Sequence, residues 1–292
     1  MDFMKWSVGD ITITKVPELD RVPGMRGLLP DATKEAVAPI KWLQPHFVTE
    51  DLKMLASIHA LVVEAGDRRI LVDTCVGNDK KRAYDKWNRM DGPFLQDLEA
   101  AGFPRESIDT VLCTHLHIDH VGWNTMWDGE KWLPTFDKAR YLMGKTEFEY
   151  WEKEAEEDDG SAMLETGEVF ADSVRPVFEA GLVDLIETDH VICDGVRLVP
   201  TVGHTPGHVS VLIESKGETA LITGDFMHHP CQIAHPEWAA AVDYDSKQST
   251  QTRRDIFAQY ADTPTLIIGT HFSSPTAGRL VRDGDGYRLD VS

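Results

Sequence analysis

The sequence has few of the features that mark membrane-spanning, secreted or disulfide-stabilised proteins. No apolar run reaches the roughly 18 residues that a membrane-spanning helix needs. The first ten residues, MDFMKWSVGD, lack the apolar core of a secretory signal peptide. Only four cysteines occur among the 292 residues, and none forms a CxxC pair. We therefore expect reduced cysteines, a cytoplasmic location and no membrane partner.

Basic residues are also scarce. The chain has 29 lysines and arginines against 49 aspartates and glutamates, which gives a net charge of −20. Such a field repels phosphate backbones, so we expect no nucleic-acid partner. A G-x-S-x-G nucleophile elbow is missing as well.

Hydrophobic patterning predicts strands and helices in both halves of the chain. The predicted strands cover 6–16 (a pair), 58–66, 68–74, 108–113, 196–203, 208–214, 219–225, 265–271 and 279–291 (a hairpin). The predicted helices cover 93–102, 145–160, 168–180 and 247–261. No linker or low-complexity stretch divides the chain. We expect one α/β domain over 1–292, with a two-layer sheet core covered by helices.

Residues 17–55 have no clear periodicity, and five prolines interrupt them. Long irregular segments of this kind often serve as active-site lids or oligomer arms. We expect 17–55 to act as a lid or a dimerisation segment, the latter in a homodimer. Its apolar side chains, among them Leu29, Trp42 and Phe47, suit either a pocket wall or a cover for the core.

Metal-capable side chains are concentrated in THLHIDH at 114–120, directly after a predicted strand. Imidazole nitrogen and carboxylate oxygen are ligands that zinc favours. In an extended segment, residues two apart share a side, so His115 and His117 can converge on one ion. Asp119 and His120 follow a turn and can face a second ion. Burying such a cluster without a cation would be costly.

Three further candidates follow predicted strands elsewhere in the chain. His204 comes after VRLVPTVG, Asp225 after TALITG and His271 after TLIIGT. A carboxylate has two oxygens, so Asp225 is a natural bridge between two ions. His208 begins the next strand, and we expect it to support a ligand or to lie in the core.

The combination of THLHIDHVG, GHTPGH, TGD and a late GTH resembles the metallo-β-lactamase-fold hydrolase superfamily over roughly residues 58–282. The resemblance implies an αββα sandwich of two mixed β-sheets, with two divalent ions, zinc first among them, at one edge. It implies that one ion is held by His115, His117 and His204. It implies that the other is held by Asp119, His120 and His271, with Asp225 bridging the two.

The branch within the superfamily is indicated by GDFMHHP, the DSKQSTQTRR helix and GTHFSSPTAGR. These segments resemble the lactonase and methyl-parathion-hydrolase branch. The bridging Asp225 argues against a true lactamase of class B. Acyl-homoserine-lactone lactonases have a tyrosine three residues after the bridging aspartate, where this chain has His228, so their particular substrate is in question.

The expected reaction is hydrolysis of a lactone or carboxylic ester of a small molecule. Two ions lower the pKa of a shared water, and the hydroxide attacks the carbonyl carbon. Asp119 would move the proton and His228 would donate a hydrogen bond, so both are predicted catalytic residues. The alternatives are phosphotriester or thioester hydrolysis and, with a single iron, a dioxygenase on the same fold. The other interpretation of His228 is that it lines the pocket and takes no part in the reaction.

Overall fold

Two seven-stranded sheets form the centre of the computed structural model, which describes residues 3–160 and 164–292. The first sheet contains, in spatial order, β1 (Lys5–Val8), β2 (Ile11–Pro23), β3 (Leu55–Ala65), β4 (Arg68–Val72), β5 (Thr110–Cys113), β8 (Arg140–Gly144) and β9 (Val183–Ile186). The second contains β10 (Val191–Cys193), β11 (Val196–Pro200), β12 (Val209–Ser215), β13 (Glu218–Ile222), β14 (Leu266–Ile268), β15 (Ala277–Asp283) and β16 (Gly286–Asp290). Both sheets mix parallel and antiparallel pairs.

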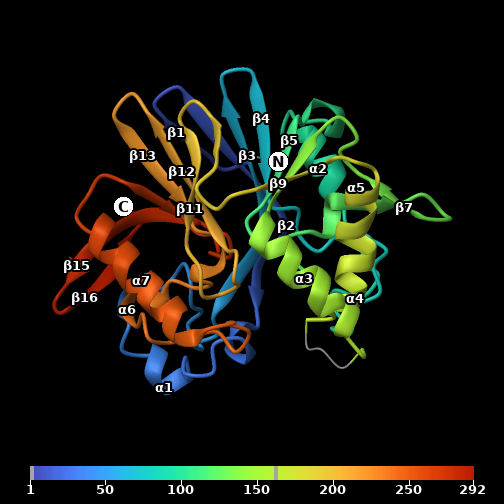
Figure 1. The fold of residues 1–292 in the computed structure, drawn as a ribbon. Helices are drawn as coiled ribbons and strands as arrows, with labels where there is room; N and C mark the ends of the chain where they lie inside the picture. The colour runs from blue at the N-terminus through green and yellow to red at the C-terminus, as the bar shows by residue number, and fades with distance from the viewer. Residues whose placement is uncertain (1–2, 161–163) are drawn as a thin grey trace.

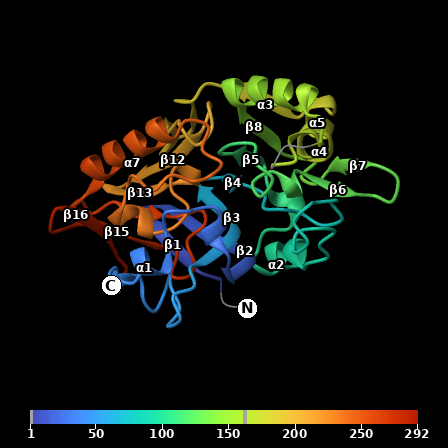
Figure 2. The ribbon, with the colours of Figure 1, turned by 90° about the horizontal axis from the view of Figure 1, so that it is seen from below.

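Helices cover the outer face of each sheet (Figures 1 and 2). The first sheet is flanked by α2 (Phe94–Ala100), α3 (Lys145–Glu157), α4 (Thr166–Val169) and α5 (Arg175–Glu179), with the hairpin β6 (Thr125–Trp127) and β7 (Trp132–Pro134) beside them. The second is flanked by α6 (Cys231–Ala234), α7 (Ser246–Tyr260) and the short α1 (Lys34–Val37). This confirms the predicted αββα sandwich. In the described part of the chain, no helix is long and apolar enough to cross a membrane.

The core between the sheets is built from strand side chains that alternate in direction. Ile13 and Val63 of the first sheet and Val211 and Ile213 of the second are fully buried in one cluster. A second cluster lies between the first sheet and its helices, and a third lies under α7. β3 and most of β12 are covered on both faces, and accordingly they contain almost continuous apolar runs.

The 17–55 segment differs from the predicted irregular stretch. Residues 17–23 continue β2, with register shifts against β3 on either side of Leu19. Pro17 lacks an N–H, which favours a break in the ladder at this place. Further along, Leu29 and Phe47 are fully buried in the cluster under α7. These two side chains therefore belong to the hydrophobic core and are not exposed to solvent.

The predicted helix 168–180 is interrupted by a π-helical turn at Phe170–Val174, between α4 and α5. Pro176 explains the turn, because a proline cannot bond to the carbonyl four residues earlier. That carbonyl belongs to Asp172, and it accepts hydrogen bonds from Thr125 and from the buried Lys80, whose Nζ lies 3.3 Å away. The distortion thus ties the helix to the loop before α2.

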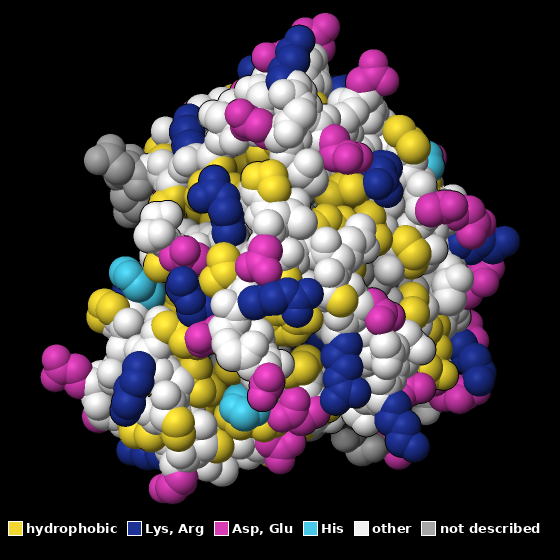
Figure 3. Space-filling model, turned by 90° about the vertical axis from the view of Figure 1, so that its left-hand side faces the viewer, with side chains coloured by type: hydrophobic (Ala, Val, Ile, Leu, Met, Phe, Trp, Pro, Cys, Tyr) yellow, Lys and Arg dark blue, Asp and Glu magenta, His cyan; other side chains and the backbone are white. Residues whose placement is uncertain are grey.

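Charged side chains are interspersed on the surface. On the face shown in Figure 3, Lys and Arg lie among Asp and Glu, with small apolar patches between them. No extended basic area is visible on this face, in agreement with the net charge of −20.

Replacing Ile213 with Ala should lower the free energy of unfolding by about 2–5 kcal/mol, because it leaves a cavity between the sheets. Denaturant unfolding of the metal-free protein measures this change. Val191→Ala on the edge strand β10 is the control, since Val191 is 61% exposed and its loss should cost less than about 0.5 kcal/mol. Equal effects of the two substitutions would contradict the assigned core.

Candidate metal centre

The structure brings together all seven side chains that the sequence predicts as metal ligands. Each comes from a loop that follows a strand, and the loops from both sheets meet at one edge of the sandwich. Their nitrogen and oxygen atoms form overlapping groups within 4.8 Å: His115, His117 and His204; His115, His120 and Asp225; Asp119, His120 and His271.

The carboxylate of Asp225 lies at the centre of this cluster. Its Oδ2 is surrounded by five imidazole nitrogens: His271 Nε2 at 3.0 Å, His120 Nε2 at 3.2 Å, His228 Nε2 at 3.3 Å, His204 Nε2 at 3.8 Å and His115 Nε2 at 3.9 Å. Asp225 Oδ1 has no hydrogen-bond partner among the described residues. One oxygen therefore faces more nitrogens than hydrogen bonds alone can satisfy.

Exposure is uneven across the cluster. The ligand candidates from His115 to His271 are at most 5% exposed. The side chain of Asp119 is the exception at 16%. Its two carboxylate oxygens lie 3.6 Å from His120 Nε2 and 3.6 Å from His271 Nε2. Asp119 is therefore the most accessible side chain among the seven ligand candidates.

Burial and charge move the pKa values in opposite directions within the cluster. Burial lowers the pKa of His115 and His117 well below the usual value, and neighbouring histidines lower it further. Burial also opposes protonation of His120 and His271, but nearby carboxylates, Asp225 foremost, outweigh it. The pKa of His120 is raised well above its usual value, and that of His271 rises to about 9.

The donor set fits divalent cations. His117 Nδ1 and His204 Nε2 face each other at 3.0 Å, and His120 Nε2 and His271 Nε2 face each other at 3.2 Å. His115 Nε2 is buried without a hydrogen-bond partner in the described chain. Converging imidazole lone pairs around a carboxylate are the ligands that zinc and similar ions favour. The cluster is therefore a candidate centre for two such ions.

Three histidines of the cluster donate a hydrogen bond from Nδ1 to an acceptor outside the cluster. This bond orients the ring so that its Nε2 points toward Asp225. Asp73 accepts a hydrogen bond from His120 Nδ1 at 2.9 Å. Asp243 accepts one from His204 Nδ1 at 2.8 Å. The carbonyl of Ser57 on β3 accepts one from His271 Nδ1 at 3.0 Å.

The backbone N–H of Asp225 is held from behind by His208. It donates to His208 Nε2 at 2.7 Å, so this fully buried histidine contacts the backbone of a candidate ligand. Gly224 makes this approach possible, since a Cβ at its φ of +57° would lie 2.6 Å from His208 Nε2. The glycine of TGD therefore sets the position of the aspartate.

Glu147 on α3 is a supporting residue that the sequence analysis missed. Its buried carboxylate accepts the backbone N–H of Leu116 at 3.1 Å and that of Gly207 at 2.9 Å. It thus joins the loop of His115 and His117 to the loop of His204. Asp243 was missed as well, because no strand precedes it. Asp73 directly follows the apolar run of β4, so the strand-end pattern that identified Asp225 could have found it.

The two histidines after Asp225 have different surroundings. The His228 ring is parallel to that of His271, with centroids 5.9 Å apart, and its Nδ1 has no hydrogen-bond partner in the described chain. His229 instead donates from Nε2 to the carbonyl of Phe47 at 2.9 Å and so holds the N-terminal segment. His228 therefore faces the cluster, and His229 faces the core.

A sequence profile of the metallo-β-lactamase superfamily matches residues 55–271. This range contains every member of the cluster. The chain belongs to the metallo-β-lactamase superfamily. Its His/Asp cluster is suited to a dinuclear metal site.

Relatives in the superfamily include lactonases and a metallo-hydrolase. The N-acyl homoserine lactonase of Bacillus sp is 29% identical over 129 residues, which are 44% of this chain and 42% of that relative. This chain thus spans about two fifths of the length of the lactonase it matches. The probable metallo-hydrolase YybB of Bacillus subtilis (strain 168) is 26% identical over 222 residues, which cover 76% of this chain and 83% of that protein.

Solved structures of the superfamily match over nearly the whole chain. The hydrolase AbOPH superimposes with a TM-score of 0.79 at 27% identity, covering 99% of this chain and 97% of that one. AidC, described as a dizinc quorum-quenching lactonase, superimposes with a TM-score of 0.78 at 20% identity and the same coverage. At 20% identity, the similarity to AidC shows a shared fold and nothing further.

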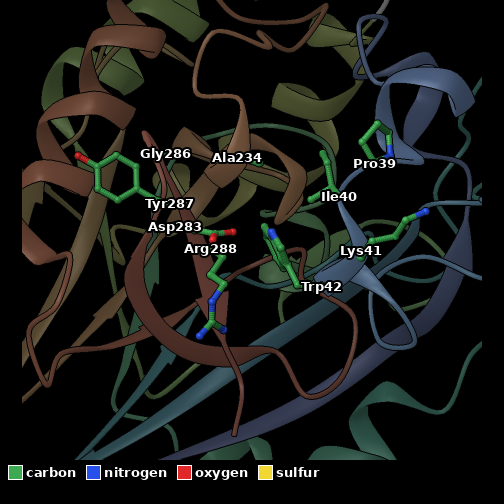
Figure 4. Close-up of a pocket in the computed structure, with 9 residues that line it drawn as sticks. All are labelled: Pro39, Ile40, Lys41, Trp42, Ala234, Asp283, Gly286, Tyr287 and Arg288. Carbon is green, nitrogen blue, oxygen red and sulfur yellow. The ribbon is translucent and has the colours of Figure 1, made fainter.

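A surface hollow of about 610 Å³ is lined by residues other than those of the His/Asp cluster (Figure 4). Trp42 and its neighbours line one side, and Tyr287 and Arg288 of β16 line the other. None of the lining residues belongs to the cluster. Trp42, for which the sequence left open a pocket wall or a cover for the core, thus lines this hollow.

Metal binding should release protons near pH 7. His120 and His271 have raised pKa values in the metal-free protein, about 9 for His271, and each must lose its proton to bind an ion. The apparent affinity for zinc should therefore rise with pH up to about 9. Calorimetric titration with zinc in buffers of different ionisation enthalpy counts the released protons. A binding enthalpy that is independent of the buffer would contradict this expectation.

Proposed function

We propose that the protein hydrolyses a lactone or carboxylic ester of a small molecule with two divalent ions, most simply zinc, held by the seven clustered side chains. The observation that carries this proposal is the overlap of the ligand groups at Asp225. Each of the two implied sets contains three further side chains, and Asp225 Oδ2 lies within 3.9 Å of nitrogens from both. A carboxylate between the two sets could serve both ions.

The second ligand set favours two ions over one. A mononuclear iron dioxygenase would not require Asp119, His120 and His271 to converge as a complete group beside the first one. AidC, which has the same fold, is described as a dizinc enzyme. Both observations support hydrolysis over oxidation.

Lactones lead the substrate proposal because several relatives are lactonases. These include the N-acyl homoserine lactonase of Bacillus sp and AidC in complex with a homoserine product. According to the family resemblance, His228 stands where acyl-homoserine-lactone lactonases have a tyrosine. We therefore propose the lactone and ester class and leave the acyl-homoserine lactones as one member of a panel.

The seven clustered side chains would hold the two ions, which would supply Lewis-acid activation of a carbonyl group and of a water molecule. Asp119, which is partly exposed and belongs to the second group, would accept a proton from the attacking water. His228 Nε2 lies 3.3 Å from Asp225 Oδ2, and its ring would donate a hydrogen bond to the developing oxyanion or the leaving oxygen.

The test is a panel of lactones, aryl esters, thioesters and phosphotriesters, assayed together with the metal content of the protein. We expect two zinc-like ions per chain and the highest kcat/KM on a lactone or carboxylic ester. One iron per chain with oxygen consumption would overturn the proposal. A preference for phosphotriesters would agree with the two-ion centre but would contradict the proposed lactone and ester substrates.

The ligand assignment is tested with His117→Ala, which should lose metal and at least about 100-fold of kcat/KM, because an ion of the centre would lose a ligand. The matched control is His235→Ala. His235 lies outside the cluster, pairs with Glu237 and should be replaceable without loss of metal. Full turnover in metal-free His117→Ala would refute the assignment.

Replacing His228 with Phe should lower kcat by about 100-fold while two ions remain bound, because the donor is lost and the ring volume is kept. Metal analysis and steady-state kinetics measure the two effects separately. An unchanged kcat would reduce His228 to a wall of the site.

A further inference from the structure

Arg253 on α7 is one of the largest fully buried side chains in the protein. Its guanidinium donates to the carbonyl of Phe226 at 2.8 Å from Nη1 and to that of Pro236 at 2.7 Å from Nε. Its Nη2 donates to Ser249 Oγ at 3.2 Å. Burying a guanidinium is costly unless such acceptors compensate for the lost water. The acceptors come from two separate loops, so Arg253 fixes their relative positions.

Asp243 connects the same guanidinium to the metal centre. Its Oδ2 lies 3.9 Å from Arg253 Nη1, and its Oδ1 accepts a hydrogen bond from His204 Nδ1 at 2.8 Å. Oδ2 is also bonded to Ser249 Oγ at 2.6 Å and to the backbone N–H of Ala240 at 3.0 Å. The Asp243 and Arg253 side chains are both fully buried. These bonds fix the orientation of the Asp243 carboxylate, and in this orientation it holds the His204 ring.

The second connection runs through the backbone. Phe226, whose carbonyl Arg253 holds, directly follows Asp225 in the turn Gly224–Phe226. His204 and Asp225 lie on loops that follow different strands of the second sheet, β11 and β13. The guanidinium of Arg253 therefore contacts His204 indirectly, through the side chain of Asp243. It contacts Asp225 indirectly, through the carbonyl of the next residue, Phe226.

We propose that Arg253 and Asp243 are positioning residues of the metal centre, which hold His204 and Asp225 in register with each other. This inference rests on the proposed role of His204 and Asp225 as ligands. The carboxylate of Asp243 keeps the proton of His204 on Nδ1, so that Nε2 presents its lone pair to the ion. The planar fork of Arg253 holds both loops at once, which the single ammonium of a lysine does not do.

The experiment measures zinc affinity by chelator competition in Asp243→Asn, Arg253→Lys and Arg253→Met. We expect the affinity of the more affected ion to fall about 10- to 100-fold in each, the usual effect of losing an outer partner. The cobalt-substituted variants should show shifted d–d absorption, which reports the geometry at the ion. Arg254→Met is the matched control, because Arg254 is the next residue of α7 and is exposed; its zinc affinity should equal that of the wild type.

A purely structural role would lower the thermal stability of the metal-free variants and leave the zinc affinity of the folded protein unchanged. Wild-type affinity and an unshifted cobalt spectrum in Asp243→Asn and Arg253→Lys would therefore overturn the proposal, even if Arg253→Met fails to fold. In the double variant Asp243→Asn/Arg253→Lys, the loss should be smaller than the product of the single losses, because both act on His204. Retention of both ions by His204→Ala would instead refute the ligand assignment itself.

Discussion

The crowding of five imidazole nitrogens around one carboxylate oxygen of Asp225 is the constraint on which the rest of the site depends. Uncharged rings cannot all bond to one acceptor, and protonated rings would repel each other in a buried space. Cations relieve this conflict, since each takes several lone pairs at once. The sandwich makes the crowding possible, because loops from both sheets end at the same edge.

Holding that arrangement requires more than the ligands. Asp73, Asp243 and the Ser57 carbonyl each fix one imidazole, and each comes from a different loop or strand. Glu147 and Arg253 then join loops to one another, from α3 and α7 on opposite sides of the sandwich. The helices therefore cover the sheets and also supply the buried charges that position the loops between them.

The ligand cluster was predictable because it follows a local rule, a metal-capable residue directly after an apolar strand. His204, Asp225 and His271 obey this rule. Asp243 and Glu147 do not, since their roles depend on which loops come together in three dimensions. Among the strands, β8 and β9 escaped prediction because four- or five-residue parallel strands give little periodic signal. The end of β2 at 17–23 was missed because its prolines suggested a loop.

The N-terminal segment shows how core packing limits motion at the site. A lid that opened would expose Leu29, Leu43 and Phe47, which are fully buried, at a cost of about 1.5–3 kcal/mol for each side chain. Together these costs approach the whole stability of a typical domain. The bond from His229 to the Phe47 carbonyl would also break, three residues from Phe226, whose carbonyl Arg253 holds. Leu29, Leu43 and Phe47 are therefore held in place by the core that they complete.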